Sequence, residues 1–96
     1  MSEQLSRDSF AANPHSIFCV QGAHGEAVEL ELIDLREGRA TPGHEVFSLM
    51  FRGPLGAFLG QWMVAMAHDA IGQFELFIVP VGRTSDGLLY EAVFNR

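Results

Sequence analysis

The sequence has few cysteines and few basic residues, and each scarcity excludes a class of protein. Cys19 is the single cysteine, so no internal disulfide forms and the fold does not depend on an oxidising compartment. Six basic residues stand against twelve acidic ones, which gives a formal net charge of −6. Phosphate backbones and anionic membrane surfaces both attract basic patches. We therefore expect neither a nucleic-acid partner nor a membrane partner.

Long apolar runs are also missing. No segment approaches the ~18 consecutive apolar residues that a membrane-spanning helix requires. The stretch from Met1 to Asp8 is polar and acidic, where a secretory signal has a basic region followed by an apolar core. These two observations favour a cytoplasmic protein.

The chain does contain enough apolar residues for one core. It is 48% hydrophobic over 96 residues, which predicts a single domain over 1–96 with no room for a second core. Ten glycines and four prolines are spread along it, which indicates many turns and therefore short strands. We expect a helical N-terminal segment over residues 1–14, followed by an antiparallel β domain over residues 16–95.

The N-terminal segment is the clearest helical candidate, over residues 1–13. Ser6 is a suitable N-cap and Asp8 lies favourably in a first turn. Asn13-Pro14 ends the helix, because a residue before proline is disfavoured in the α region. A helix this short is unstable alone, so we expect Phe10 to pack against a sheet edge or the open end of a barrel.

The densest apolar run lies between Gly72 and Gly82. It is rich in β-branched and aromatic residues and too short to cross a membrane, which predicts a central strand buried on both faces. Pro80 cannot donate a ladder hydrogen bond, so the pairing on one side should stop or bulge there.

Alternating apolar residues predict further strands on either side of this run. In residues 26–35 the alternation breaks at the adjacent Leu32 and Ile33, which predicts a bulge. The flanking glycines favour a strand over residues 61–67. The alternative is a helix over residues 61–70, because methionine and alanine favour helices. The expected strands are 16–21, 26–35, 45–52, 61–67, 72–82 and 88–94. Short connections and the lack of βαβ spacing predict an all-β fold with one short N-terminal helix, as a six-stranded antiparallel small barrel or a two-layer β roll.

Histidines and the cysteine are the first candidates for chemistry. None of the histidines pairs with another at the spacing of metal ligands, so we expect no metal site and no cofactor; they are His15, His24, His44 and His68. Cys19, His68 and Asp69 have the residue types of a nucleophile, a base and an orienting group. Because Cys19 lies within a strand between Phe18 and Val20, we expect a small buried hydrophobe instead.

Paired carboxylates are the next candidates. Glu29 and Glu31 share one strand face and have the residue types of an acid/base pair, but we expect them to form a solvated outer face instead. Glu75 and Glu91 each interrupt an apolar strand, so they are expected to mark the outside of the sheet or to pair with Arg52. We expect no catalytic residues, and the chain is predicted not to be an enzyme.

Arg52, Trp62 and Met63 are the candidate binding residues. An arginine that ends an apolar strand can bind a carboxylate, either an internal one or one on a ligand, and an internal salt bridge is the default expectation. Trp62 and Met63 have the adaptable side chains of partner-binding surfaces, as do Met50 and Met66, although core packing is the simpler explanation for all of them.

Three blocks together resemble a family of small uncharacterised bacterial domains of about a hundred residues. They are Val46-Phe47-Ser48-Leu49-Met50-Phe51-Arg52-Gly53-Pro54, the run Gly72 to Gly82, and Tyr90-Glu91-Ala92-Val93-Phe94-Asn95, which fit the patterns FSLxFRGP, FELFxVPVG and YEAVFN. The resemblance covers most of residues 45–96 and departs from the pattern at residues 55–66. It implies an all-β domain with no known activity, and it associates the domain with phage-tail-like and tail-collar proteins.

These observations favour a non-enzymatic protein-interaction or structural module that acts on a protein partner or by self-association. The alternative is a small-ligand-binding β-barrel in which Arg52 is the polar anchor.

Overall fold

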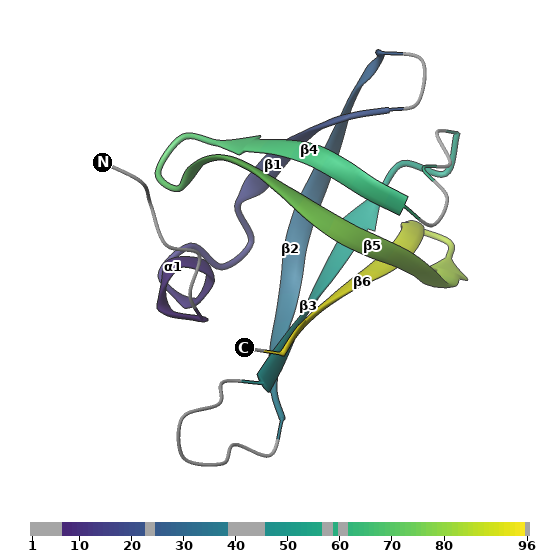
Figure 1. The fold of residues 1–96 in the computed structure, drawn as a ribbon. Helices are drawn as coiled ribbons and strands as arrows, with labels where there is room; N and C mark the ends of the chain where they lie inside the picture. The colour runs from purple at the N-terminus through teal and green to yellow at the C-terminus, as the bar shows by residue number, and fades with distance from the viewer. Residues whose placement is uncertain (1–6, 23–24, 39–45, 57–58, 60–61, 96) are drawn as a thin grey trace.

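A computed structural model describes residues 7–22, 25–38, 46–56, 59 and 62–95, and its order of elements is that of an all-β domain with one short helix (Figure 1). The elements are α1 (Arg7–Ala11), β1 (Ile17–Gln21), β2 (Ala27–Glu37), β3 (Val46–Gly53), β4 (Trp62–His68), β5 (Gly72–Thr84) and β6 (Gly87–Asn95). Residues 62–68 form a strand, which confirms the strand prediction over the competing helix. The helix ends at Ala11, two residues before the predicted end, and its predicted start with the cap Ser6 lies outside the described residues.

The strands close into a barrel in the order β1-β2-β3-β6-β5-β4, and every neighbouring pair is antiparallel. This confirms the predicted six-stranded antiparallel barrel. The ring is completed between β1 and β4, which lie far apart in the sequence. Their ladder joins two residue pairs, Cys19 with Ala67 and Val20 with Met66.

The two longest strands, β2 and β5, each pair with one neighbour along their first half and with the other neighbour along their second half. The β2 ladder to β1 runs over residues 27–31 and its ladder to β3 over residues 31–37. Likewise β5 pairs with β4 over residues 72–78 and with β6 over residues 79–84. Each strand bulges just after it changes partner, between Leu32 and Asp34 in β2 and between Pro80 and Gly82 in β5. Both predicted bulges are thus confirmed, and bulges are the usual means by which a strand passes from one sheet of a barrel to another.

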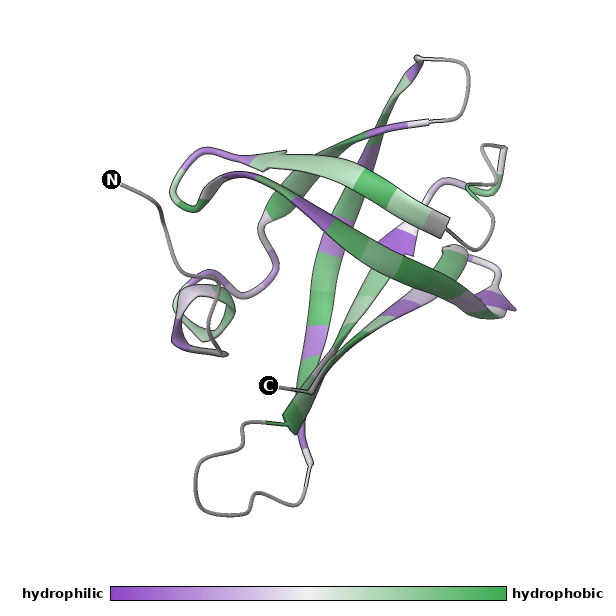
Figure 2. Cartoon of the chain, in the orientation of Figure 1, coloured by the Kyte–Doolittle hydropathy of each residue, from purple (hydrophilic) through white to green (hydrophobic). Residues whose placement is uncertain are grey.

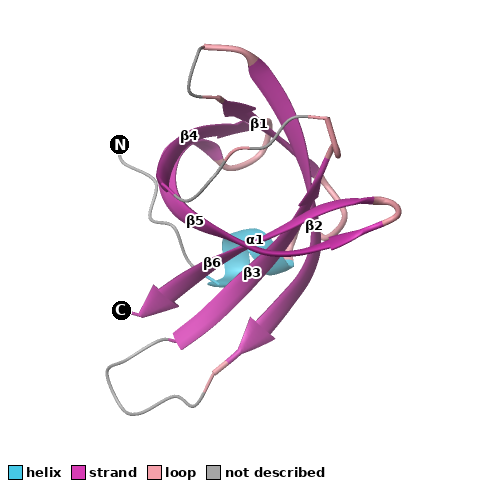
Figure 3. Ribbon diagram, turned by 90° about the vertical axis from the view of Figure 1, so that its right-hand side faces the viewer, coloured by secondary structure: helices cyan, strands magenta, loops and turns pink. Residues whose placement is uncertain are grey.

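Inward side chains of all six strands fill the interior, and α1 contributes Phe10 to them. The Phe10 ring is fully buried, and its centroid lies 5.6 Å from that of Phe94, 5.9 Å from that of Phe74 and 6.1 Å from that of Phe18. Figure 3 looks along the barrel and shows α1 behind the ring of strands. The expected packing of Phe10 at the open end of a barrel is therefore observed.

The connection between β3 and β4 adds a second apolar side chain, Leu59, to the core. Its backbone N–H donates a hydrogen bond of 3.1 Å to the hydroxyl of the fully buried Tyr90. In Figure 1 the described part of this connection and α1 lie on opposite sides of the barrel, and both Leu59 and Phe10 belong to the core.

One expectation about β5 is wrong. The strand has a paired neighbour on each edge, but only one of its faces is buried: Leu76 and Ile78 point inward, whereas Phe77 and Val81 are each 48% exposed. A barrel wall has a single buried side, and no described element covers the outside of β5. The apolar run therefore marks an apolar outer surface as well as a core strand.

Candidate functional site

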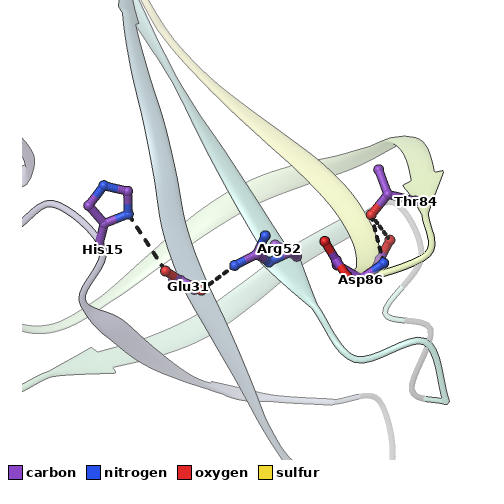
Figure 4. A network of polar contacts seen from close by, with 6 residues as sticks. His15, Glu31, Arg52, Thr84 and Asp86 are labelled. Carbon is purple, nitrogen blue, oxygen red and sulfur yellow. Dashed lines mark hydrogen bonds and ion pairs between the residues drawn. The ribbon is translucent and has the colours of Figure 1, made fainter.

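Arg52, the predicted polar anchor, lies on the outward side of β3 and binds a carboxylate of the neighbouring strand. Its Nη2 atom is 2.7 Å from Oε1 of Glu31 on β2, the residue directly opposite in the ladder. The other carboxylate oxygen of Glu31 lies 3.6 Å from Nδ1 of His15 (Figure 4). The internal salt bridge that was expected for Arg52 is thus present.

The ion pair fixes the charge state of Glu31. The hydrogen bond from Arg52 lowers the pKa of the Glu31 carboxyl below its ordinary value, against the opposing effect of partial burial, and the positive charge of Arg52 adds to this lowering. A guanidinium held in this way on the outer surface is not aimed into the barrel, whose interior is occupied by side chains such as Phe51 and Tyr90.

Cys19 and His68 do not form a nucleophile–base pair. The imidazole of His68 packs against the ring of Phe18 at a tilt of 40° with centroids 4.5 Å apart, and its Nε2 atom lies 3.0 Å from Oγ of Ser16. Its Nδ1 atom accepts hydrogen bonds from the backbone N–H groups of residues 70 and 71, which close the β4–β5 hairpin. Both ring nitrogens are therefore engaged in holding the structure together.

The expected burial of Cys19 is wrong, because its thiol is exposed. Phe18 and Val20 point into the core, so the residue between them points outward, where no described element covers it. Among the described residues no three His, Cys, Asp or Glu side chains gather at a spacing suited to a metal ion. His24 and His44 lie outside the described residues.

The methionines separate into buried and exposed side chains. Met66 points into the core, as core packing predicts; Met50 is buried on β3 but does not belong to the core cluster, and Met63 is 53% exposed on the outside of β4. Trp62 begins β4 opposite Ile78, and the structure does not describe its side chain. Of the three candidate binding residues, Met63 is the one that the structure places on an open surface.

Met63 belongs to an outer surface formed by β1, β4 and the first halves of β2 and β5, which we call the acidic face. Across its middle runs a row of paired residues, Glu29 on β2, Cys19 on β1, Ala67 on β4 and Gln73 on β5. The outward side chains of the face are Ile17, Cys19, Gln21, Ala27, Glu29, Met63, Ala65, Ala67, Gln73, Glu75 and Phe77.

The centre of the acidic face is hollowed because its middle strands carry small side chains. Cys19, Ala65 and Ala67 line an open depression of about 530 Å³, and Glu75 stands at its side. Adjoining concavities that also include Cys19 reach Glu29 on the far side. The depression thus has a small, weakly polar floor with Glu75 at its side, and Glu29 lies beyond it in the adjoining concavities on the β2 side.

A pair of large apolar residues lies one outward position along the strands from Ala65 and Glu75, which line this depression. Met63 and Phe77 lie directly opposite each other on β4 and β5, and each is about half exposed. Figure 2 shows the largely apolar colouring of these two strands, with polar interruptions. Phe77 was missed as a surface residue, although Glu75 was correctly expected to face outward; two residues further along a strand, Phe77 has to face the same way.

The remaining carboxylates have structural explanations. Glu29 is exposed and Glu31 binds Arg52, so the two carboxylates do not share a catalytic geometry. Glu75 is exposed, as expected. Glu91 is paired with Val79 of β5 and Met50 of β3 and is partly exposed.

Comparison with known proteins gives one match. Neither a curated protein nor a solved structure matches the chain. Within the described residues, no helix is long and apolar enough to span a membrane. A family model described as "Domain of unknown function (DUF6916)" matches residues 5–94, which is nearly the whole barrel and its helix. The chain therefore belongs to this family of small uncharacterised domains.

Proposed function

We propose that this domain is a non-enzymatic interaction module that binds a protein partner through the acidic face. The observation that carries the proposal is the paired exposure of Met63 and Phe77, which are 53% and 48% exposed beside a depression. Neighbouring large apolar side chains on a surface are a common mark of an interaction site. Covering apolar surface contributes roughly 25 cal/mol per Å², so a partner that buries both side chains gains substantially.

The shape of the face favours a macromolecular partner over a small ligand. Small molecules are usually held in enclosed pockets that bury most of their surface. The depression around Cys19 is open and extends over strands β1, β4 and β5. A protein segment laid across these strands covers such a surface far better than a small molecule does.

Replacement of the two exposed apolar residues tests the proposal. The partner is captured from the native host, identified, and its affinity measured for the wild type and for Met63→Ser/Phe77→Ser. We expect the double variant to bind at least about tenfold more weakly, which corresponds to roughly 1.4 kcal/mol. Val93→Ser is the matched control, because Val93 is 65% exposed on β6, outside the acidic face. Equal affinity of the wild type and the double variant would contradict the proposal.

The origin and setting of the module are part of the same proposal. The blocks at residues 46–54, 72–82 and 90–95 are proposed to be the signature of a bacterial family, and the domain to act in the cytoplasm. Its partner is proposed to belong to a phage-tail-like assembly. The gene neighbourhood in the source genome tests this setting, because genes for tail or tail-collar proteins should lie beside the gene.

A further inference from the structure

Granting the protein-binding role proposed above, on which this step rests, we infer that the partner contributes a basic, extended segment to the acidic face. Glu29 on β2 and Glu75 on β5 are exposed on either side of the small residues of β1 and β4, and no arginine is among the outward residues of the face. The face contains no arginine, and the sequence contains no lysine. Its electrostatic field is therefore negative, which attracts and orients a basic partner.

The arginines of the described strands lie elsewhere. Arg36 forms an ion pair of 2.9 Å with Asp34 on the same strand, and Arg52 forms one of 2.7 Å with Glu31 on the neighbouring strand. The charges of these two arginines are therefore balanced by carboxylates of the domain itself. Arg83 lies near the turn between β5 and β6, in the half of β5 that pairs with β6. None of them is among the outward residues of the acidic face.

Charge also disfavours a second copy of this chain as the occupant. Two copies that meet through this face bring the carboxylates Glu29 and Glu75 of one against those of the other, and no basic residue of the face compensates them. Like charges set against each other at an interface disfavour association. A partner of opposite charge is favoured by the same geometry.

The spacing of the carboxylates defines the length of the segment. Glu29 is on β2 and Glu75 on β5, with β1 and β4 between them. Neighbouring strands lie ~4.8 Å apart, so the two carboxylates are separated by roughly 15 Å across the sheet. An extended chain covers about 3.3 Å per residue, so basic residues four positions apart reach both carboxylates. The residue midway between them points toward the depression and contacts its small floor.

A designed peptide provides the probe. It carries two arginines that flank a leucine at alternate positions, with serine elsewhere, and its analogue carries glutamate in place of both arginines. Binding to the isotope-labelled full chain is followed by NMR at low salt and at physiological salt. We expect saturable shifts of the amides of Cys19, Ala65 and Ala67 with the arginine peptide, weaker binding at higher salt, and none with the glutamate analogue.

Two double variants of equal net charge separate a specific site from general attraction. In Glu29→Gln/Glu75→Gln the affinity for the arginine peptide should fall about tenfold, since each partly desolvated charge pair contributes up to about 1 kcal/mol. Asp34→Asn/Asp86→Asn removes the same charge outside the face and should retain the affinity within about twofold. Equal losses in both variants, equal binding of the two peptides, or no binding of the arginine peptide would each overturn the inference.

The outcome is distinguishable from failure of the proposed function. If Met63→Ser/Phe77→Ser abolishes binding of the identified partner while Glu29→Gln/Glu75→Gln leaves it unchanged, the face binds protein but the segment is not basic. If neither double variant changes that binding, the proposed function is wrong as well.

Discussion

The hydroxyl of Tyr90 accepts a hydrogen bond of 3.1 Å from the backbone N–H of Leu59, thirty-one positions earlier in the chain. The bond is buried and joins the β3–β4 connection to the last strand. In Tyr90→Phe the ring remains but the buried N–H loses this acceptor. We expect the free energy of unfolding to fall by about 1–3 kcal/mol, as measured by urea denaturation. An unchanged urea midpoint would show that Leu59 does not depend on this bond.

Phe10 should be essential to stability although it lies on a helix of five residues. Its ring is fully buried among other aromatic rings, including Phe94 at 5.6 Å and Phe74 at 5.9 Å. Phe10→Ala should therefore lower the free energy of unfolding by about 3–5 kcal/mol, as for other buried phenylalanines. Ala11→Ser, on an exposed position of the same helix, is the control and should change it little. Similar small losses in both variants would mean that α1 is not part of the cooperative core.

Gly87 is required where the β5–β6 hairpin approaches β3. A Cβ atom at this position would collide with the backbone carbonyl oxygen of Gly53 and come within 2.8 Å of the Arg52 side chain. Because a backbone oxygen cannot turn aside, Gly87→Ala should cost about 1–3 kcal/mol in thermal or urea unfolding. Gly56→Ala is the matched control, since a Cβ there meets no atom within 4 Å. A loss that is equal in the two variants would refute the close approach.

The Glu31–Arg52 pair should make stability depend on pH. Because Arg52 lowers the pKa of Glu31 in the folded protein, the stabilisation is present above the ordinary pKa of about 4 and is lost as the pH falls through the lowered folded value. The stability difference between the wild type and Arg52→Gln should therefore shrink as the pH is lowered from neutral to about 3. Arg83→Gln, which removes an exposed arginine away from Glu31, should not show this dependence. A pH-independent difference for Arg52→Gln would contradict the assignment.

Cys19 should react in the native protein. Its thiol is exposed on the acidic face, so a maleimide reagent should label it at neutral pH without denaturant and at a rate similar to that of the unfolded chain. An attached bulky group would occupy the depression and should block the arginine peptide. Labelling that requires denaturant would show that the outside of β1 is covered.

Much of the fold could be predicted from local pattern. Alternation, one dense apolar run and flanking glycines together placed all six strands, the adjacent Leu32 and Ile33 indicated the bulge in β2, and Pro80 indicated that in β5. The sequence pattern did not show whether the second face of a strand is covered by another element. The run from Gly72 to Gly82 was apolar enough for burial on both faces, but a barrel wall has only one buried side, and Phe77 is left half exposed.

The candidate site was harder to predict than the fold. Its central row depends on the contact between Cys19 and Ala67, residues of two strands that become neighbours only when the ring closes. Sequence spacing carries no signal for that contact. Arg52 was correctly expected in an internal salt bridge, because its strand-end position fits a neighbouring carboxylate, whereas the acidic face emerges only from the register of strands distant in the chain.

The short junction between β1 and β4 gives the acidic face a mechanical significance. The β1–β4 ladder that completes the ring has two residue pairs, Cys19 with Ala67 and Val20 with Met66. Separation of β1 from β4 would therefore open the barrel with the smallest loss of strand pairing. A bound segment that contacts both β1 and β4 would hold these two strands together. Occupancy of a surface and resistance of the whole barrel to opening are then coupled, and an assembly that recruits this domain also reinforces it.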